Sequence, residues 1–326
     1  MPENASRDDV SRLIEQTVDR LRADREHGAS WLSREAAHLL ERLTTSVPAR
    51  QAQARVVLVR HAAMQLAQVR PSMAAVAIGV ARIWSAGSEV VEGDASEQAG
   101  TRLERIHTAA QNVLTSWNSS ADQITAVARP LLGPTVFTLS RSGTVEAVLS
   151  RLARAHEEHS MRRVLVAESR PGGEGVVTAR ALAKVGLAVT LVPDAAIGAV
   201  IGEASVVVLG ADSVRANGDV VNKVGSYPLS LVAREAGVPV YVLAETLKIA
   251  APNFPLILEP LEWPEMPQLP GPGIELRSVG FEVVPARLIT EVISEAGPLD
   301  RIQIAARAQA VGRVLAELLA TCAPGG

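Results

Sequence analysis

The chain up to Ala128 carries apolar side chains three or four positions apart, which is the spacing of one face of an α-helix. This spacing is clear from Val10 to Leu21 and again from Leu39 to Leu43, whereas the alternation typical of strands is scarce. Pro71 interrupts the pattern and suits the first turn of a following helix. The pattern predicts a helical N-terminal domain over residues 1–130.

After Pro130, short β-branched runs alternate with helical segments, which is typical of a parallel sheet covered by helices. The expected strands are Thr135–Thr138, Arg163–Ala167, Ala188–Val192, Ser205–Leu209 and Val238–Leu243. The expected helices are Gly143–His159, Gly175–Val185 and Ser226–Ala236. This domain is predicted to span residues 131–326, so the whole chain is expected to be an α/β protein.

The last seventy residues begin with a proline-rich stretch, Pro255–Pro272, which contains Trp263 and is expected to form an irregular loop or flap. Phe281–Pro285 is then expected to resume the sheet. Ile302–Leu319 is apolar at helical spacing. This helix would pack on the domain or on another subunit.

The amino-acid composition argues against nucleic acid as a binding partner. Hydrophobic residues make up 48% of the chain but aromatic residues only 3%, which argues against an aromatic platform for single-stranded nucleic acid. Lys and Arg total 32 against 35 Asp and Glu, a formal net charge of −3, so nothing biases the chain toward a polyanion. No direct nucleic-acid binding is expected.

Cys322 is the single cysteine, so an internal disulfide and cysteine-rich zinc sites are both excluded. The N-terminus lacks the basic-then-apolar pattern of a signal peptide, and polar residues interrupt every apolar run before it reaches membrane-spanning length. These features predict a cytoplasmic protein without a membrane segment.

Two further motifs resemble a metal site and a nucleotide-binding loop, but their residue spacing does not match the known motifs. His156 and His159 lie three residues apart, which is not the metalloprotease spacing, and no third ligand is evident, so a solvated helix face is expected there. Gly172–Gly175 matches neither the dinucleotide fingerprint nor a Walker loop. Neither a metal nor an organic cofactor is predicted.

Polar residues follow every expected strand, and in open α/β sheets ligands bind outside the carboxyl ends of the strands. These residues are Ser140–Thr144, Glu168–Gly173, Pro193–Asp194, Gly210–Ser213, and Glu245 with Lys248. The first group places hydroxyls, a glycine and a cation before a helix, which suits a phosphate. A simple N-cap by Ser142 or Thr144 explains the same residues.

Asn222 and Lys223 follow a predicted hairpin turn at Asn217–Asp219. A lysine that neutralises charge and an amide that orients hydroxyls suit a phosphorylated sugar, although an exposed loop before a capped helix fits equally.

Three charged residues at strand ends have two interpretations each. Asp212 either caps a turn or acts in the site. Asp194 is expected to cap the following helix, although its place after a strand resembles that of Asp212. Arg170 binds either a phosphate or a neighbouring acid.

Four motifs occur in the order found in three related groups of proteins: Gly210–Asp212, Asn217–Gly218, Asn222–Leu229 and Gly237–Val242. On these motifs the chain resembles ribose-1,5-bisphosphate isomerases, methylthioribose-1-phosphate isomerases, and the alpha, beta and delta regulatory subunits of eukaryotic initiation factor 2B. The likeness runs from about Leu132 to Gly297 and is weaker upstream.

The resemblance implies an N-terminal helical domain followed by a Rossmann-like parallel-sheet domain, with ligand contacts drawn from both. Asp212 matches the isomerases' catalytic aspartate, Ser140 stands at the position of their catalytic cysteine, and His27 replaces a phosphate-binding arginine. The implied contacts to a phosphorylated sugar or nucleotide are Gly28, Ala29, Arg70, Ser142, Gly143, Thr144, Asn222, Lys223 and Lys248.

Two functions follow from the resemblance. The match at Asp212 indicates an aldose–ketose isomerase acting on ribose 1,5-bisphosphate or a similar sugar. The serine at position 140 favours a non-catalytic protein that senses a sugar phosphate or nucleotide and regulates a partner, because a hydroxyl ionises less readily than a thiol. A homodimer or higher homo-oligomer is expected in either case, paired through the final strands and the C-terminal helix.

Overall fold

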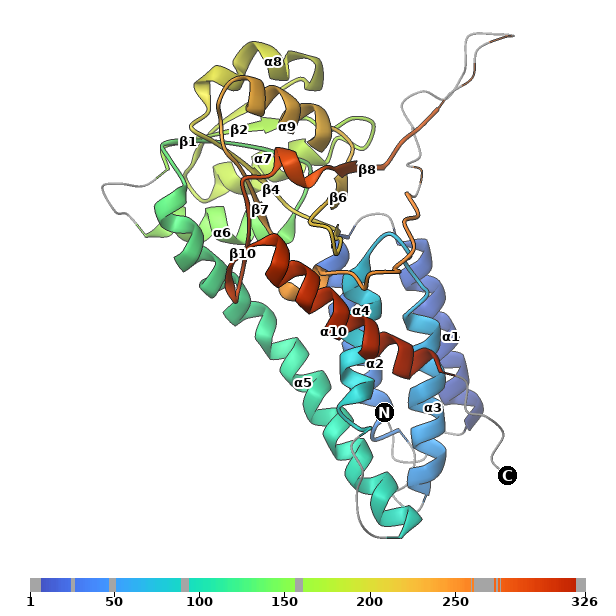
Figure 1. The fold of residues 1–326 in the computed structure, drawn as a ribbon. Coiled ribbons are helices and arrows are strands. Elements are labelled where there is room, and N and C mark those ends of the chain that lie inside the picture. Colours follow the sequence, from blue (N-terminus) through green and yellow to red (C-terminus); the bar gives the residue numbers. More distant parts are fainter. Residues whose placement is uncertain are drawn as a thin grey trace. The chain divides into compact units, whose positions relative to one another are not determined.

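The computed structural model is shown in Figure 1, and its contacts divide the chain into two units. The first unit comprises Met1–Ser119, Leu247–Phe254 and Ala306–Gly326, and the second comprises Ser120–Thr246 and Pro255–Ala305. The structure describes residues 7–24, 27–46, 51–88, 94–155, 161–258, 260, 273, 275 and 277–320. The predictions for His156, His159, Trp263 and Cys322 therefore lie outside the described residues.

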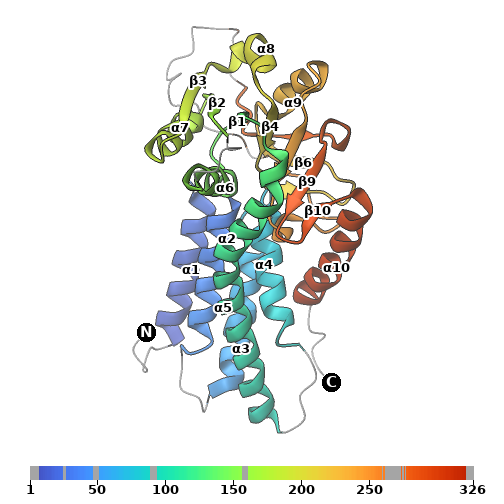
Figure 2. The ribbon, with the colours of Figure 1, turned by 90° about the vertical axis from the view of Figure 1, so that its left-hand side faces the viewer.

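The first unit is helical, as predicted. Its helices are α1 (Arg7–Ala23), α2 (Ala29–Leu43), α3 (Ala52–Leu66), α4 (Ala74–Ser85) and the part of α5 (Ala95–Ala128) up to Ser119. Figure 2 shows α1 to α4 side by side. Small residues let α2 and α4 approach closely, because a Cβ at Gly79 would lie 2.8 Å from Ser33 Oγ.

The second unit contains a seven-stranded sheet in the order β10-β9-β7-β4-β1-β2-β3. The strands are β1 (Thr135–Leu139), β2 (Arg163–Ala167), β3 (Ala188–Val192), β4 (Val206–Leu209), β7 (Val240–Leu243), β9 (Glu291–Ser294) and β10 (Gly297–Leu299). All neighbours run parallel except β9 and β10. In the central register, Val136 faces Val164 on one side and Val206 on the other. The predicted parallel sheet is confirmed.

Helices α6 (Gly143–Arg154) and α7 (Glu174–Lys184) pack on this sheet, and a core forms between them and the strands (Figure 1). Helix α9 (Ser226–Glu235) contacts β4 and β7, and α8 (Ile197–Val200) contacts α9. The last helix, α10 (Arg301–Leu319), belongs to this unit only up to Ala305. The core cluster includes Val136 of β1, Leu149 of α6 and Leu182 of α7. It also includes Ile124 and Ala128, which come from the end of α5. Apolar residues at alternate strand positions and at helical spacing therefore meet in one layer.

The strands of a second, antiparallel sheet alternate along the chain with the later strands of the main sheet. This sheet is formed by β5 (Ser213–Val214), β6 (Val220–Lys223) and β8 (Phe281–Val284). The predicted hairpin turn is confirmed between β5 and β6, where Gly218 has a φ of 87° that favours glycine. The prediction that Phe281–Pro285 resumes the main sheet is wrong, because β8 pairs with β6 instead. Among the described residues, no helix is long and apolar enough to cross a membrane.

Candidate functional site

The carboxyl ends of β1 and β4 lie side by side, because the two strands are neighbours in the sheet. Between them, the direction in which successive strands are added to the sheet reverses. From β1 the sheet continues through β2 and β3 on one side and through β4 and β7 on the other. Such a reversal is where ligands bind in open α/β sheets. Ser140 follows β1 directly, and Asp212 follows β4 by three residues. The sheet thus places the segments containing both predicted catalytic residues at the same edge.

Ser140 adopts a left-handed backbone conformation, with a φ of 57°. For a residue with a Cβ this conformation costs about 1–2 kcal/mol and needs support from its surroundings. The support comes from two hydrogen bonds. Ser140 N donates to Ser169 Oγ at 2.7 Å, and Ser140 O accepts from Thr178 Oγ1 at 2.8 Å. The residue is only 6% exposed, and its own hydroxyl makes no hydrogen bond to any described residue.

The loop after β2 is fixed by Asp194, which lies after β3. Asp194 Oδ1 accepts from Ser169 N at 2.9 Å, and Asp194 Oδ2 accepts from Arg170 N at 2.6 Å. Asp194 was expected to cap the helix that it begins, but that helix has no side-chain cap. The expectation is wrong, because two amides of a distant loop compete successfully for the carboxylate. Arg170 Nε lies 3.4 Å from Glu168 Oε2, so the neighbouring acid predicted as one of its two partners is present.

The start of α6 combines capping with contacts to the ends of two other strands. Ser142 is the N-cap residue, and its Oγ accepts from Val145 N at 3.4 Å. A Cβ at Gly210, after β4, would lie 2.4 Å from this hydroxyl, whereas a Cβ at Gly143 would meet nothing within 4 Å. Thr144 donates from Oγ1 to Glu245 Oε1, after β7, at 2.8 Å. The capping interpretation of Ser142 is therefore confirmed, and Gly143 leaves open space beside it.

Lys223, predicted to contact a ligand, forms an ion pair with a residue that sequence reasoning missed. Its Nζ lies 2.8 Å from Glu174 Oε1 and 4.7 Å from the centre of the Phe281 ring. Glu174 begins α7, and Thr178, one turn further along, holds the Ser140 carbonyl. The first turn of α7 thus joins Lys223 to the turn at Ser140.

The neighbouring Asn222 is buried and engaged locally. Asn222 Nδ2 donates to Ser226 Oγ at 2.8 Å, and Ser226 Oγ donates to the carbonyl of Lys223 at 2.6 Å. These bonds close the turn between β6 and α9.

The N-terminus of α9 is occupied by a carboxylate from β8. Glu282 Oε1 accepts from Tyr227 N at 2.8 Å, and the amides of Gly225 and Ser226 lie near the same carboxylate. Burial raises the pKa of Glu282 above its ordinary value of 4.5, and these three amides partly oppose the shift. The free amides that would make this helix start a phosphate site are therefore already bound to an acid.

Four of the implied ligand residues belong to the first unit. Gly28 is the N-cap of α2, directly before Ala29, and a Cβ there would meet nothing within 4 Å. Arg70 is 4% exposed and donates from Nη1 to the carbonyl of Asp24 at 2.6 Å. Lys248 is 3% exposed and ends the turn Thr246–Lys248. Arg70 and Lys248 are thus buried cations.

His27, the replacement for an arginine, is held by Asp24 and Trp31. Its amide donates to Asp24 Oδ1 at 2.8 Å, and its Nδ1 lies 2.8 Å from Asp24 Oδ2. The imidazole stacks on the Trp31 ring with 3.9 Å between the ring centres. This imidazole is therefore fixed in orientation next to Gly28.

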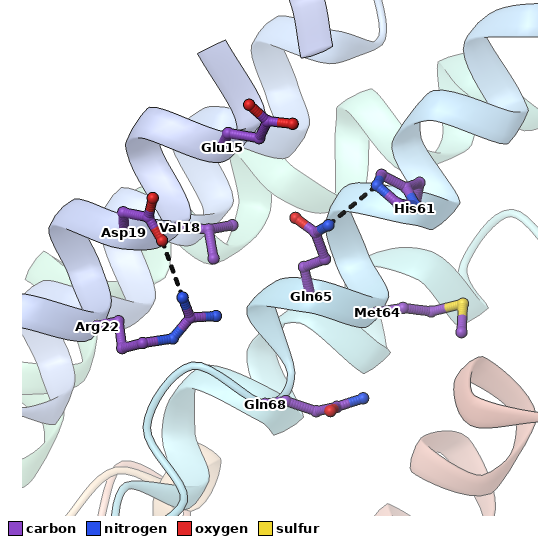
Figure 3. Close-up of a pocket in the computed structure, with 8 residues that line it drawn as sticks. All are labelled: Glu15, Val18, Asp19, Arg22, His61, Met64, Gln65 and Gln68. Carbon is purple, nitrogen blue, oxygen red and sulfur yellow. Dashed lines mark hydrogen bonds and ion pairs between the residues drawn. The ribbon is translucent and has the colours of Figure 1, made fainter. Parts of the chain in front are cut away.

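Figure 3 shows a hollow of about 370 Å³ between α1 and α3 of the first unit. Four of its charged and polar residues contact one another in pairs: Arg22 Nη1 lies 2.8 Å from Asp19 Oδ1, and Gln65 Nε2 lies 3.0 Å from His61 Nε2. None of the residues predicted to bind a ligand lines this hollow. In the part of the chain that the structure describes, no three His, Cys, Asp or Glu side chains are grouped so as to hold a metal ion.

Comparisons with known proteins agree with this geometry. The model of the Initiation factor 2 subunit family matches residues 25–301. The ribose 1,5-bisphosphate isomerase of Archaeoglobus fulgidus is 35% identical over 172 residues, which cover 51% of this chain and 54% of that protein. The methylthioribose-1-phosphate isomerase of Pelotomaculum thermopropionicum is 36% identical over 160 residues, which cover 46% of this chain and 44% of that protein. The matched region thus spans about half the length of these relatives.

A solved structure covers more of the chain. The translation initiation factor eIF-2B of Pyrococcus horikoshii superposes with a TM-score of 0.71 at 25% sequence identity, covering 88% of this chain and 96% of that one. The likeness therefore extends through both units. The relatives and this structure represent the three groups that the sequence motifs resemble.

Proposed function

Because the chain belongs to the initiation factor 2 subunit family, we propose that it binds a phosphorylated pentose where β1 and β4 end. The observation that carries this proposal is the adjacency of Ser140 and the Asp212 segment at the reversal of strand order. Relatives named as ribose 1,5-bisphosphate and methylthioribose-1-phosphate isomerases support it. The proposed activity is the conversion of ribose 1,5-bisphosphate, or a similar C1-phosphorylated aldose, into the ketose.

The proposed reaction moves a proton between adjacent carbons of the sugar, so it requires an acid or base beside them. We assign this role to the Asp212 carboxylate, because assistance of this kind is commonly worth about 10²–10⁴ in rate. Ser140 takes the position of the isomerases' cysteine. Its hydroxyl, which no described residue binds, is proposed to donate a hydrogen bond to the sugar and to move protons poorly.

The activity is tested by following ribose 1,5-bisphosphate with phosphorus NMR in the presence of the full chain. Ribulose 1,5-bisphosphate should appear, and Asp212→Asn should slow its formation by about 100-fold. Asp122→Asn is the matched control, because Asp122 pairs with Arg151 on the surface of the same unit. Equal rates for the two variants would remove Asp212 from the mechanism.

The presence of a serine at position 140 favours a second function, in which the same site at the ends of β1 and β4 binds the sugar phosphate as a signal without converting it. Ribose 1,5-bisphosphate would then raise the melting temperature of the chain, because a ligand that binds the folded state stabilises it. No ribulose 1,5-bisphosphate would form at high protein concentration. If no phosphorylated sugar or nucleotide raised the melting temperature, both functions would be rejected.

We also propose that the chain self-associates through β9, β10 and α10. Ile302, on the first turn of α10, is 79% exposed, which is high for a large apolar side chain. Size-exclusion chromatography with light scattering would measure the mass of the particle that the chain forms in solution. A monomer at micromolar concentration would contradict the proposal.

A further inference from the structure

The ion pair between Lys223 and Glu174 changes what Lys223 can recognise. Its two side chains are 13% and 23% exposed, so water screens them only partly. With Nζ and Oε1 2.8 Å apart, the two charges cancel at short range. A phosphate that approached this ammonium would also approach the carboxylate and would be repelled by it.

The second oxygen of Glu174 points to the chemistry of the ligand. Glu174 Oε2 is buried and has no hydrogen-bond partner in the described part of the chain. A buried acceptor without a donor is unfavourable by about 1–3 kcal/mol, and more when it is charged. A ligand hydroxyl that donated to this oxygen, and accepted from Lys223 Nζ, would satisfy both groups together.

The carboxylate lies against the loop before it. A Cβ at Gly172 would lie 2.7 Å from Glu174 Oε2, so the carboxylate packs directly on the glycine backbone. Gly173 has a φ of 66°, which turns the chain into α7. The contact with Gly172 and the ion pair with Lys223 together define the position of the carboxylate.

The surrounding strand ends add further negative charge. The acids Glu168, Asp194, Asp212 and Glu245 follow the strands of the same unit, against two cations, Arg141 and Arg170. Arg170 is itself paired with Glu168. The amides at the start of α9 are bound to Glu282. This part of the site therefore offers hydrogen bonds to neutral groups and little net positive charge to a phosphate.

We propose that Glu174 determines which ligand group binds beside Lys223. Paired with Glu174, Lys223 hydrogen-bonds a sugar hydroxyl, and the Glu174 carboxylate excludes phosphate from that position. This inference rests on the proposed function, in that the hydroxyl belongs to the phosphorylated sugar bound at the strand ends.

Calorimetric titration of the full chain with inorganic pyrophosphate, an anion without carbon-bound hydroxyls, tests the exclusion. Glu174→Gln keeps the shape of the side chain and should bind pyrophosphate about ten-fold more tightly than wild type. The gain should vanish in the double variant with Lys223→Met. Glu203→Gln is the matched control, because it removes the same charge at the opposite, amino-terminal edge of the sheet, where Glu203 pairs with Arg163.

The double variant Glu174→Gln with Lys223→Met removes both charges and keeps the net charge of wild type. Wild type and this double variant should bind pyrophosphate equally, because the paired lysine is not available to the anion. A ten-fold loss in the double variant would overturn the proposal. Equal pyrophosphate affinity in folded Glu174→Gln and Glu203→Gln would do the same.

Deoxy sugars separate this inference from the proposed function. Wild type should prefer ribose 5-phosphate over its 2-deoxy or 3-deoxy analogue by about ten-fold, and Glu174→Gln should lose that preference. If wild type bound ribose 5-phosphate but Glu174→Gln kept both its hydroxyl preference and its pyrophosphate affinity, only the inference would fail. If no variant bound a sugar phosphate while Glu174→Gln still gained pyrophosphate, the proposed function would fail and the charge exclusion would stand.

Discussion

Thr178 donates a hydrogen bond from Oγ1 to the carbonyl of Ser140 at 2.8 Å, which ties α7 to the turn after β1. Ser169 holds the amide of Ser140 from the other side. The strained serine is thus fixed by two elements that follow it in the chain. This arrangement orients the residue at the centre of the proposed site before any ligand binds, and it determines which substitutions are informative.

Replacing Ser140 with cysteine should increase isomerase turnover. A thiol has a pKa of about 8.5 and ionises much more readily than a hydroxyl, so the Ser140→Cys variant should turn over at least about ten-fold faster than wild type. The Ser140→Ala variant serves as the comparison, because alanine must adopt the same left-handed backbone conformation at this position. The rates would be measured by phosphorus NMR. A Ser140→Cys variant no faster than Ser140→Ala would show that proton transfer at this position does not limit the reaction.

Removing the Ser169 hydroxyl should destabilise the fold. This hydroxyl accepts from Ser140 N and donates to the carbonyl of Ala167, so Ser169→Ala leaves a buried amide without its partner. The free energy of unfolding, measured with urea, should fall by about 1–3 kcal/mol. Ser119→Ala provides the control, since Ser119 is an exposed helical serine. Similar losses in both variants would argue against a stabilising hydrogen bond between Ser140 N and Ser169 Oγ.

Two glycines at helix starts should respond differently to alanine. A Cβ at Gly175 would lie 1.8 Å from the carbonyl oxygen of Ala167, whereas a Cβ at Gly143 would meet nothing within 4 Å. Gly175→Ala must push α7 away from β2 and should cost about 3 kcal/mol of unfolding free energy. Gly143→Ala should leave stability nearly unchanged. Equal melting temperatures for the two variants would contradict the close approach of α7 to β2.

Glu282 should make stability depend on pH. Burial raises its folded-state pKa above the ordinary 4.5, so the folded state binds the proton more tightly than the unfolded state does. The stabilising contribution of this proton is fully present below about pH 4.5 and is lost as the pH rises through the raised pKa. Glu282→Gln cannot ionise. The unfolding free energy of wild type should therefore fall relative to that of this variant as the pH rises.

Urea denaturation of both proteins between pH 4 and pH 8 would measure this difference. Titrations elsewhere in the chain are common to both proteins and cancel in the comparison. A difference that stays constant, or that grows in favour of wild type with rising pH, would contradict the burial of Glu282.

The sequence predicted the elements of the main sheet that carry a strong local signal. The runs at β1, β2, β3, β4 and β7 are each predicted to within two residues, because apolar and β-branched residues dominate them. The short strands β9 and β10 were not foreseen. Phe281–Val284 was assigned to the wrong sheet because its pairing with β6 depends on contacts almost sixty residues away in the chain.

The contents of the site were predictable only in part. Residues at strand ends can be named as candidates from position, and these include Ser140, Ser142 and Asp212. The catalytic roles of Ser140 and Asp212 come from the family resemblance and stay predictions. The partners of site residues cannot be named from position, because Glu174 meets Lys223 across 49 positions and Asp194 meets Ser169 across 25. Local capping rules explained Ser142 but failed for Asp194, whose carboxylate serves a distant loop.

The path of α5 bears on how the chain can be shortened. Ile124 and Ala128 at its end are fully buried in the core of the sheet-containing unit, although they precede the first strand. A fragment that starts at Leu131 would expose the apolar surface these two side chains cover and would tend to aggregate. A fragment that starts near Ser120 keeps both residues, so the last turns of this helix are better treated as the opening element of the sheet-containing unit.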